Sequence, residues 1–227
     1  MRKLIPWVCV AFVLCGCGGG SNYVAPQAVG YTQGGILIVN DWANYWAQAA
    51  SYTFTFKQPL VAPCTIMVAS ADQLNYGTIK DSQGNSFEVA TGQSDLRLLY
   101  SNSCASGTDT ITVTCPNNLP CWEEVIFAVY AGALTPVQVS PETFNVVSEY
   151  GWSAPVLAEA GELVIGIGSN HTTGLPGIIG DGGFTLRDHA NAFIEDMVAT
   201  ASGEVTSKVT YSSPVNWCQF TMSFKPR

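Results

Sequence analysis

Thr110-Ile-Thr-Val-Thr114 places an apolar side chain at every second position, between threonines. A period of two is the pattern of a β-strand with one face on the core and the other in water. Tyr52-Thr-Phe-Thr-Phe56 repeats the pattern with aromatic side chains, which strands favour. Convincing helical periodicity is scarce elsewhere, so the sequence predicts an all-β protein built from antiparallel sheets.

Further strand-like runs are separated by turn residues along the chain. They cover residues 35–39, 65–69, 86–90, 96–100, 125–130, 163–167, 184–186, 205–211 and 220–224. With the two alternating runs they make about ten strands, at spacings typical of a β-sandwich. Two segments could instead form short helices, at residues 41–50 and 191–198.

Asp81-Ser-Gln-Gly-Asn85 is a strong hairpin signal. Asp and Asn side chains bond their own backbone in turns, and glycine adopts the positive φ that such turns need. A loop with Asp and Gly can also bind Ca²⁺ through oxygen ligands, but the spacing of an EF-hand is absent. The sequence therefore favours a hairpin turn over a calcium loop.

The first 17 residues have the layout of a secretory signal. Arg2 and Lys3 precede an uncharged, apolar run at residues 4–14. Leu14-Cys-Gly-Cys17 then resembles the lipobox of bacterial lipoproteins, although Ala or Ser is commoner than Cys at position 15 in that family. The resemblance implies that residues 1–16 are a cleaved signal peptide and that Cys17 becomes the acylated N-terminus.

This interpretation divides the chain into three parts. Residues 1–16 are the signal, residues 17–22 are the lipidated cysteine and a flexible Gly-rich tether, and residues 23–227 are a single β-sandwich domain. The apolar run is shorter than the about 20 residues of a transmembrane helix. Plain secretion and an uncleaved anchor are the alternatives. The expected location is the bacterial cell envelope, with the protein lipid-anchored in the outer membrane or at the cell surface.

The chain is acidic and poor in charge. Its 227 residues include 9 Lys and Arg against 17 Asp and Glu, and charged residues make up 11% of the total. Cleavage after residue 16 would remove two cations and no acid, so the net charge would change from −8 to −10. Such a domain repels phosphate, which argues against a nucleic-acid partner. It also lacks a basic patch for anionic lipids, so the membrane would be a partner through the acyl chains alone.

Five of the eight cysteines lie beyond the expected cleavage site: Cys64, Cys104, Cys115, Cys121 and Cys218. Export to an oxidising compartment favours disulfides. Cys115-Pro-Asn-Asn-Leu-Pro-Cys121 has the form of a loop closed by a local bridge. Metal binding is the alternative, but no histidine is near and the spacing is not that of a zinc site. Cys64 and Cys218 alternate in phase with apolar residues, so both should point into the core, where they could pair. Five is odd, so one thiol stays free or pairs with another chain.

Three stretches carry a second resemblance. They are residues 76–87, which contain the Asp81 turn, the pair Leu99-Tyr100, and Gly107-Thr-Asp-Thr-Ile-Thr-Val-Thr114. They resemble a recurrent bacterial extracellular module, and Gly161-Glu-Leu-Val-Ile-Gly166 is similar to a later strand of it. The resemblance implies a jelly-roll-like antiparallel β-sandwich of surface and secreted proteins. It carries no assigned activity.

Catalytic motifs are missing from the sequence. The sequence has two histidines, His171 and His189, but no Gly-x-Ser-x-Gly nucleophile motif for which either could act as the base. Arg187-Asp-His189 could orient an imidazole, but it fits a polar loop after the preceding strand better. A glycosidase needs two carboxylates, and the candidates are Glu123, Glu124, Glu149 and Glu159; with 17 acids, chance pairs are common. We therefore expect no enzyme activity, no cofactor and no metal site.

Candidate binding residues fall in two groups. Asn170, His171 and Asp181 belong to a Gly-rich region, where they could hydrogen-bond sugar hydroxyls; a flexible crossover is the alternative. The second group contains the aromatic residues Trp42, Tyr45 and Trp46. Aromatic faces stack on sugar rings and on partner surfaces, whereas Trp42 and Trp46 at helical spacing would cap the core.

These features together favour a lipid-anchored extracytoplasmic binding module for a glycan or a surface protein. The tether, the aromatic cluster and the Gly-rich loops carry that hypothesis. An envelope-structural lipoprotein without a small ligand is the alternative, and a hydrolase is the third hypothesis.

Overall fold

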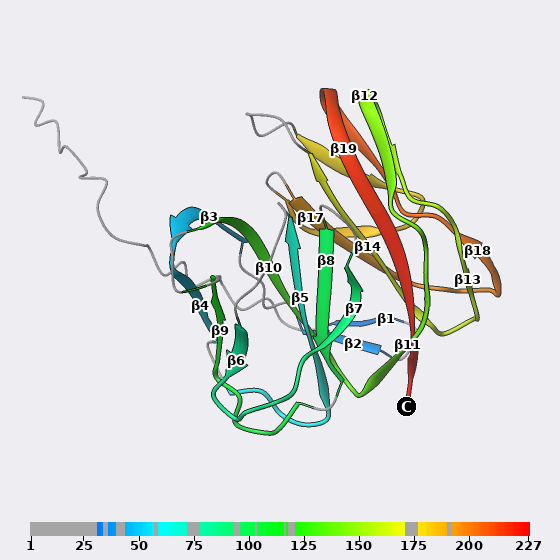
Figure 1. The fold of residues 1–227 in the computed structure, drawn as a ribbon. Coiled ribbons are helices and arrows are strands. Elements are labelled where there is room, and N and C mark those ends of the chain that lie inside the picture. The colour runs from blue at the N-terminus through cyan, green and yellow to red at the C-terminus, as the bar shows by residue number, and fades with distance from the viewer. Residues whose placement is uncertain are drawn as a thin grey trace, which may run out of the picture.

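The computed structural model describes residues 31–33, 36–39, 44–56, 59–71, 78–92, 96–102, 104–115, 117, 121–170, 177–189 and 192–227. Its elements are the strands β1 to β19 (Figure 1). Every predicted strand run overlaps one of them, and all pairings are antiparallel, so the all-β class is confirmed. The predicted signal peptide at residues 1–16, the tether at 17–22 with Cys17, and the side chains of Trp42 and His171 lie outside the described residues.

The strands of the described residues form four sheets. The central sheet has the order β1 (Tyr31–Gln33), β2 (Ile36–Val39), β10 (Cys121–Ala131), β5 (Cys64–Ala71), β8 (Leu96–Ser101) and β7 (Glu88–Gly92), and β3 (Asn44–Ala49) also pairs with β10. The small outer sheet has the order β4 (Ser51–Thr55), β9 (Thr110–Thr114) and β6 (Thr78–Asp81).

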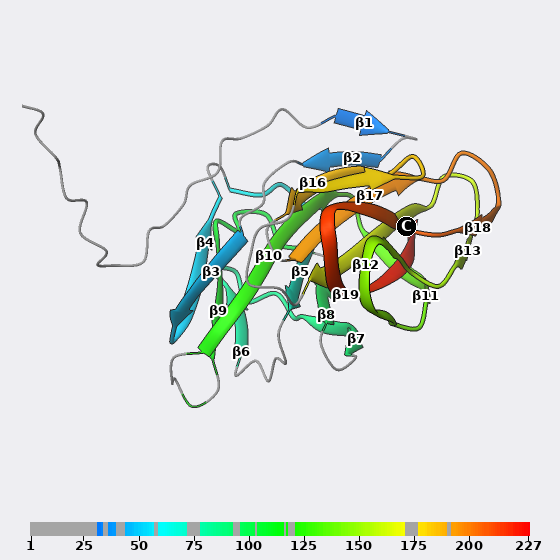
Figure 2. The ribbon, with the colours of Figure 1, turned by 90° about the horizontal axis from the view of Figure 1, so that it is seen from above.

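The large outer sheet has the order β11 (Leu134–Val139), β19 (Lys208–Pro226), β14 (Leu163–Asn170), β17 (Ala192–Val198) and β16 (Thr185–His189). β12 (Thr143–Trp152) and β15 (Ile178–Asp181) also pair with β19. The fourth sheet consists of β13 (Val156–Ala158) and β18 (Gly203–Val205). The central sheet lies between the small and large outer sheets (Figures 1 and 2).

Both faces of the central sheet are buried. On β5, Ile66 and Val68 pack toward the small outer sheet, whereas Met67 and Ala69 pack toward the large one. Strand β10 divides its side chains between the two cores in the same way. A strand buried on both faces loses the polar alternation of a half-buried strand. This explains why these segments are continuous apolar runs in the sequence.

The described residues of the two expected helices form strands instead. Residues 44–49 form strand β3, which pairs residue for residue with β10, and residues 192–198 form strand β17. On β17, Ala192 and Ile194 face the central sheet while Phe193 faces the opposite side. Because β17 is buried on both faces, apolar residues occupy neighbouring positions in its sequence, and this pattern resembles the apolar face of a helix. Pairing with other strands overrode the weak local preference.

The turn at residues 81–85 has the predicted chemistry but not the predicted pairing. Asp81 Oδ1 accepts hydrogen bonds from the backbone N–H groups of Gln83 (2.9 Å) and Asn85 (3.1 Å), and Gly84 has φ 73°. However, β6 pairs with β9 and β7 pairs with β8. The turn therefore carries the chain from the small outer sheet to the central sheet, and the expected hairpin is wrong.

The disulfide pattern also differs from one of the expectations. Cys64 is bonded to Cys104, and both pack beneath the small outer sheet. Cys218 is a buried thiol on the other side of the central sheet, so Cys64 and Cys218 cannot pair. Cys115 is disulfide-bonded, and the side chain of Cys121 lies outside the described ones. The Cys115–Cys121 bridge therefore stays a prediction.

Replacing Cys64 and Cys104 together with alanine should lower the free energy of unfolding by about 2 to 4 kcal/mol. The bond joins residues 40 positions apart, so its loss frees a long loop in the unfolded chain. Urea unfolding of the oxidised protein and of the double variant measures the difference. An unchanged unfolding midpoint would contradict a stabilising role for this bond.

Candidate functional site

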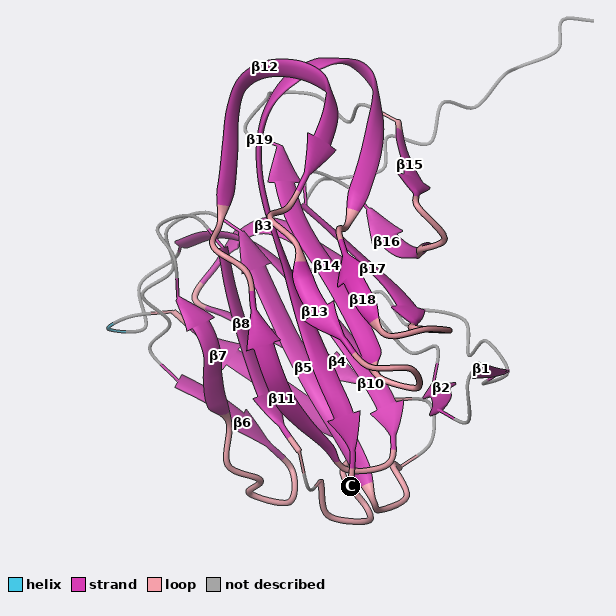
Figure 3. Ribbon diagram, turned by 90° about the vertical axis from the view of Figure 1, so that its right-hand side faces the viewer, coloured by secondary structure: helices cyan, strands magenta, loops and turns pink. Residues whose placement is uncertain are grey.

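The β12–β19 pair is a long two-stranded ribbon that arches away from the body of the protein (Figure 3). Residues 143–145 of β12 pair with 217–219 of β19 in the large outer sheet, and residues 150–152 pair with 208–210 farther along. Strand β15 pairs with the other edge of β19 at 208–211. Residues 150–152, 208–211 and 178–181 thus form a three-stranded surface.

One side of this surface is closed against the protein. Val209, Tyr211 and Ile178 are buried together with Trp217 of the large outer sheet. Gly151 lies on the same side, and a Cβ atom there would stand 3.0 Å from Gln219 Oε1 and 3.0 Å from Val209. The close approach of the strands therefore requires glycine at this position.

The opposite side faces solvent, and we call it the ribbon face. Directly paired residues on antiparallel strands project to the same side. The pairing produces two rows: Tyr150, Thr210 and Ile179 in one, and Trp152, Lys208 and Asp181 in the other. The exposed fractions of Tyr150, Ile179 and Trp152 are 60%, 69% and 43%.

One ring of the ribbon face, that of Trp152, also packs against a buried side chain. The ring of Trp152 lies 5.1 Å, centre to centre, from that of the fully buried Trp217, at an angle of 58°. A ring fixed in this way loses little conformational entropy when a ligand packs on it. The face therefore combines two aromatic rings and an isoleucine with an ammonium and a carboxylate at one end. Such a surface can stack on an apolar face and hydrogen-bond hydroxyl groups.

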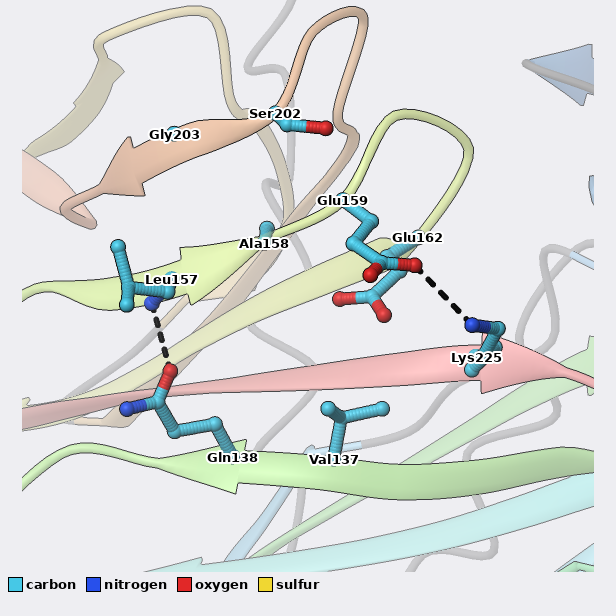
Figure 4. Close-up of a pocket in the computed structure, with 9 residues that line it drawn as sticks. All are labelled: Val137, Gln138, Leu157, Ala158, Glu159, Glu162, Ser202, Gly203 and Lys225. Atoms are coloured by element: carbon cyan, nitrogen blue, oxygen red, sulfur yellow. Dashed lines mark hydrogen bonds and ion pairs between the residues drawn. The ribbon is translucent and has the colours of Figure 1, made fainter.

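A groove of about 570 Å³ forms a second candidate site (Figure 4). Its lining comes from β11, β13, β18, β19 and the turn after β13: Val137, Gln138, Leu157, Ala158, Glu159, Glu162, Ser202, Gly203 and Lys225. Gln138 Oε1 accepts a hydrogen bond from the Leu157 backbone N–H at 2.6 Å, and this bond joins the two walls.

The two carboxylates of the groove differ in their hydrogen bonds. Lys225 Nζ lies 3.0 Å from Glu159 Oε2, and this hydrogen bond raises the pKa of Lys225. Glu162 is only 3% exposed, and its buried Oε2 has no hydrogen-bond partner.

Two acids of β17 form buried polar clusters that sequence reasoning missed. Asp196 accepts two hydrogen bonds from Arg187, at 2.8 and 2.6 Å, and one from the Tyr130 hydroxyl at 3.0 Å. This cluster joins the large outer sheet to the central sheet. Burial, together with Asp196, holds the pKa of Tyr130 well above its usual value.

Glu195 points to the other side of the large outer sheet. Its Oε1 accepts a hydrogen bond from Ser207 Oγ at 2.5 Å, and Gln219 donates in turn to Ser207. Burial raises the pKa of Glu195 to about 8, against the lowering effect of the Ser207 hydrogen bond. The side chains of Glu195, Ser207 and Gln219 are fully buried. The acidic pair inside the apolar run 192–198 was the one sequence signal for these clusters.

Of the predicted ligand-binding residues, the structure describes the side chains of Asn170 and Asp181. Tyr45 and Trp46 belong to strand β3 and not to the expected helix, and their side chains lie outside the described ones. Asn170 is buried at the end of β14, with an exposed fraction of 3%. Asp181 is exposed and lies on the ribbon face. Trp42 and His171 lie outside the described residues.

The catalytic alternatives are placed as follows. Strand β16 contains Arg187, Asp188 and His189, so these residues are not in a loop. Arg187 forms a salt bridge with the buried Asp196. Glu149 and Glu159 are exposed on different elements. Within the described part of the chain, no three His, Cys, Asp or Glu side chains gather as a metal site would require. No helix in that part is long and apolar enough to cross a membrane.

Comparison of the chain with family models, with curated proteins and with solved structures finds no match.

Proposed function

We propose that the protein is a lipid-anchored, extracytoplasmic binding module that holds a glycan chain on the ribbon face and catalyses nothing. In this proposal Cys17 carries the lipid, residues 18–22 are the tether, and the described sheets belong to a jelly-roll-like module at the bacterial cell surface. The anchor rests on the lipobox-like sequence. The binding role rests on the ribbon face.

The observation that carries the proposal is the exposure of Tyr150, Trp152 and Ile179 on one side of a three-stranded surface. Aromatic rings on a firm sheet present flat apolar area, and such rings are common anchors of binding surfaces. The row that contains Trp152 ends in Lys208 and Asp181, whose charges can bond hydroxyl groups beside a stacked sugar ring. This alternation of ring and polar group favours a glycan over an apolar protein surface.

The non-catalytic part of the proposal has a separate support. Glu195 and Asp196, the acids set in polar clusters, have no exposed area. A substrate therefore has no route to them in this conformation. Among the described side chains, no histidine lies beside the exposed acids of the ribbon face and the groove, so the hydroxyl groups of Thr210 and Ser202 have no imidazole base there.

Replacing Trp152 or Tyr150 with alanine should weaken glycan binding by about tenfold or more, the effect of losing a stacked aromatic anchor. A glycan array with the purified protein identifies the ligand, and titration of the variants measures the loss. Phe144→Ala is the matched control, because Phe144 is 56% exposed on the same strand but pairs with Cys218, away from the ribbon face.

Thermal unfolding accompanies each titration, since Trp152 also packs on Trp217. Tyr150→Ala should melt like the wild type, because the Tyr150 side chain is largely exposed. Undiminished binding by both folded variants would remove the ribbon face from the site. Capture of a protein partner that is lost in the same two variants would replace the glycan with a protein ligand.

A further inference from the structure

We propose that the groove between β11, β13 and β18 binds a cationic alkyl group, an ammonium or guanidinium at the end of an apolar stem. A lysine or arginine side chain of a polypeptide carries this chemistry, and so does a free alkylamine. The site is separate from the ribbon face, so either can be disproved without the other.

The acceptor for the cation is Glu162. Its side chain points into the groove beside Glu159 (Figure 4), it is 3% exposed, and its Oε2 has no hydrogen-bond partner. A buried carboxylate oxygen without a donor is unfavourable, and native structures nearly always satisfy such atoms. A donor on a ligand in the groove would supply the missing bond.

The charge of the groove selects a cation. Two carboxylates, Glu159 and Glu162, face one ammonium, Lys225, so the lining carries a net charge of −1. Lys225 is hydrogen-bonded to Glu159, and both side chains are more than half exposed, whereas the buried Oε2 atom of Glu162 receives no hydrogen bond. The excess of acids over the whole chain also attracts cations to the surface.

The walls of the groove suit an alkyl stem. Val137 and Leu157 line it, with exposed fractions of 53% and 62%. The methylene groups of lysine and arginine pack against such surfaces while the charged end reaches a polar partner. The Gln138–Leu157 hydrogen bond fixes the two walls in advance. The volume of about 570 Å³ lies in the range of small-ligand sites.

An organic cation fits this lining better than a metal ion does. Metal sites gather three or more acidic, histidine or cysteine ligands, and no such group occurs among the described residues. The ammonium of Lys225 beside the carboxylates would oppose a divalent ion. A singly charged group bonded to Glu162 avoids that conflict.

The test is a titration of the full-length protein followed by backbone NMR shifts at Leu157 and Gly203. The probes are n-pentylammonium, a capped Gly-Gly-Lys-Gly-Gly peptide, and the same peptide with its lysine acetylated. We expect saturable shifts with the two charged probes and none with the acetylated peptide. Tighter binding of the lysine peptide than of pentylammonium identifies a polypeptide as the source, and the reverse order identifies a free amine.

Three variants make the test specific. Glu162→Gln should weaken binding by about tenfold, since it removes a charge-assisted hydrogen bond. Lys225→Ala should strengthen binding by about threefold, because it removes a competing cation from an exposed position. Glu149→Gln, an exposed acid outside the groove, should leave binding unchanged.

Equal binding of the charged and acetylated peptides would overturn the proposal, and so would affinities that fall alike in Glu162→Gln and Glu149→Gln. The absence of a saturable shift with either charged probe would also overturn it. Lys225→Ala keeps the test decisive if Glu162→Gln does not fold, because a weaker affinity in that variant contradicts the assigned charge of the site.

Discussion

Replacement of Asp196 with alanine should lower the free energy of unfolding by about 3 to 5 kcal/mol, the range for breaking a buried ion pair from one side. Asp196 is fully buried and accepts hydrogen bonds from Arg187 and Tyr130. Its removal leaves the Arg187 charge buried without its carboxylate, and leaves the Tyr130 hydroxyl without its acceptor. Urea unfolding at neutral pH, followed by circular dichroism, measures the change.

Two further variants test the cause of this loss. Replacing Arg187 with methionine and Asp196 with leucine together should restore most of the stability, because apolar side chains of similar volume remove both buried charges at once. Lys225→Ala breaks the exposed pair with Glu159 and should change the unfolding free energy little. A small loss in Asp196→Ala, comparable to that in Lys225→Ala, would show that the buried cluster of Asp196, Arg187 and Tyr130 does not stabilise the fold.

The sequence predicted strands well where one face is buried. The alternation at Thr110–Thr114 is that of β9, whose Ile111 and Val113 enter the core while its threonines are partly exposed. It predicted poorly where both faces are buried, because apolar residues then occupy neighbouring positions. Phe193 and Ile194 on β17 belong to cores on opposite sides of one strand, and their adjacency suggested a helix.

The arrangement of the sheets could not be predicted from local sequence patterns, because such patterns do not specify which strands pair. Asp81 accepts the hydrogen bonds expected of it from the backbone of the turn, yet these bonds carry no information about the partners of β6 and β7. The same holds for Cys64, whose inward direction followed from alternation. The choice between Cys104 and Cys218 depended on which core each thiol entered.

The ligand-binding residues chosen from the sequence stay a prediction. Aromatic side chains near Gly-rich segments were the expected signature, and Asp181 was among the chosen residues. The clustering of Trp42, Tyr45 and Trp46 in the sequence drew attention to these residues, whose side chains lie outside the described ones, and away from Tyr150 and Trp152, whose rings are exposed. Tyr150 and Trp152 lie on either side of a glycine, a spacing that puts both side chains on one face of a strand. That this face is exposed follows only from the pairing of β12, β19 and β15.

The stability of the protein should fall between about pH 4.5 and about pH 8 through the titration of Glu195. Burial raises the pKa of Glu195 from 4.5 to about 8 in the folded protein, and Asp196 and Asp181 raise it further against the hydrogen bond from Ser207. Between these values the unfolded chain has released the proton that the folded protein still holds. Rising pH therefore favours unfolding until the folded carboxyl also ionises near pH 8, above which this contribution is constant.

The size of the effect follows from the width of that pH range. The difference between a pKa of 4.5 in the unfolded chain and about 8 in the folded protein corresponds to about 5 kcal/mol of unfolding free energy, at about 1.4 kcal/mol per pKa unit. Glu195→Gln removes the titration, because an amide stays neutral while its oxygen can still accept the hydrogen bond from Ser207. The variant should be no more stable than the wild type at pH 4.5 and more stable by a few kcal/mol above pH 8.

Urea unfolding of both proteins from pH 4 to pH 9 provides the measurement, and the difference between the two curves isolates Glu195 from the other titrating groups. Asp181→Asn is a matched control, since Asp181 is exposed and raises the pKa of Glu195 by its charge alone. That variant should keep the decline but end it at a lower pH. Parallel curves for the wild type and Glu195→Gln would mean that the folded protein accommodates an ionised carboxylate beneath β15, in spite of an Oε2 atom that has no partner there.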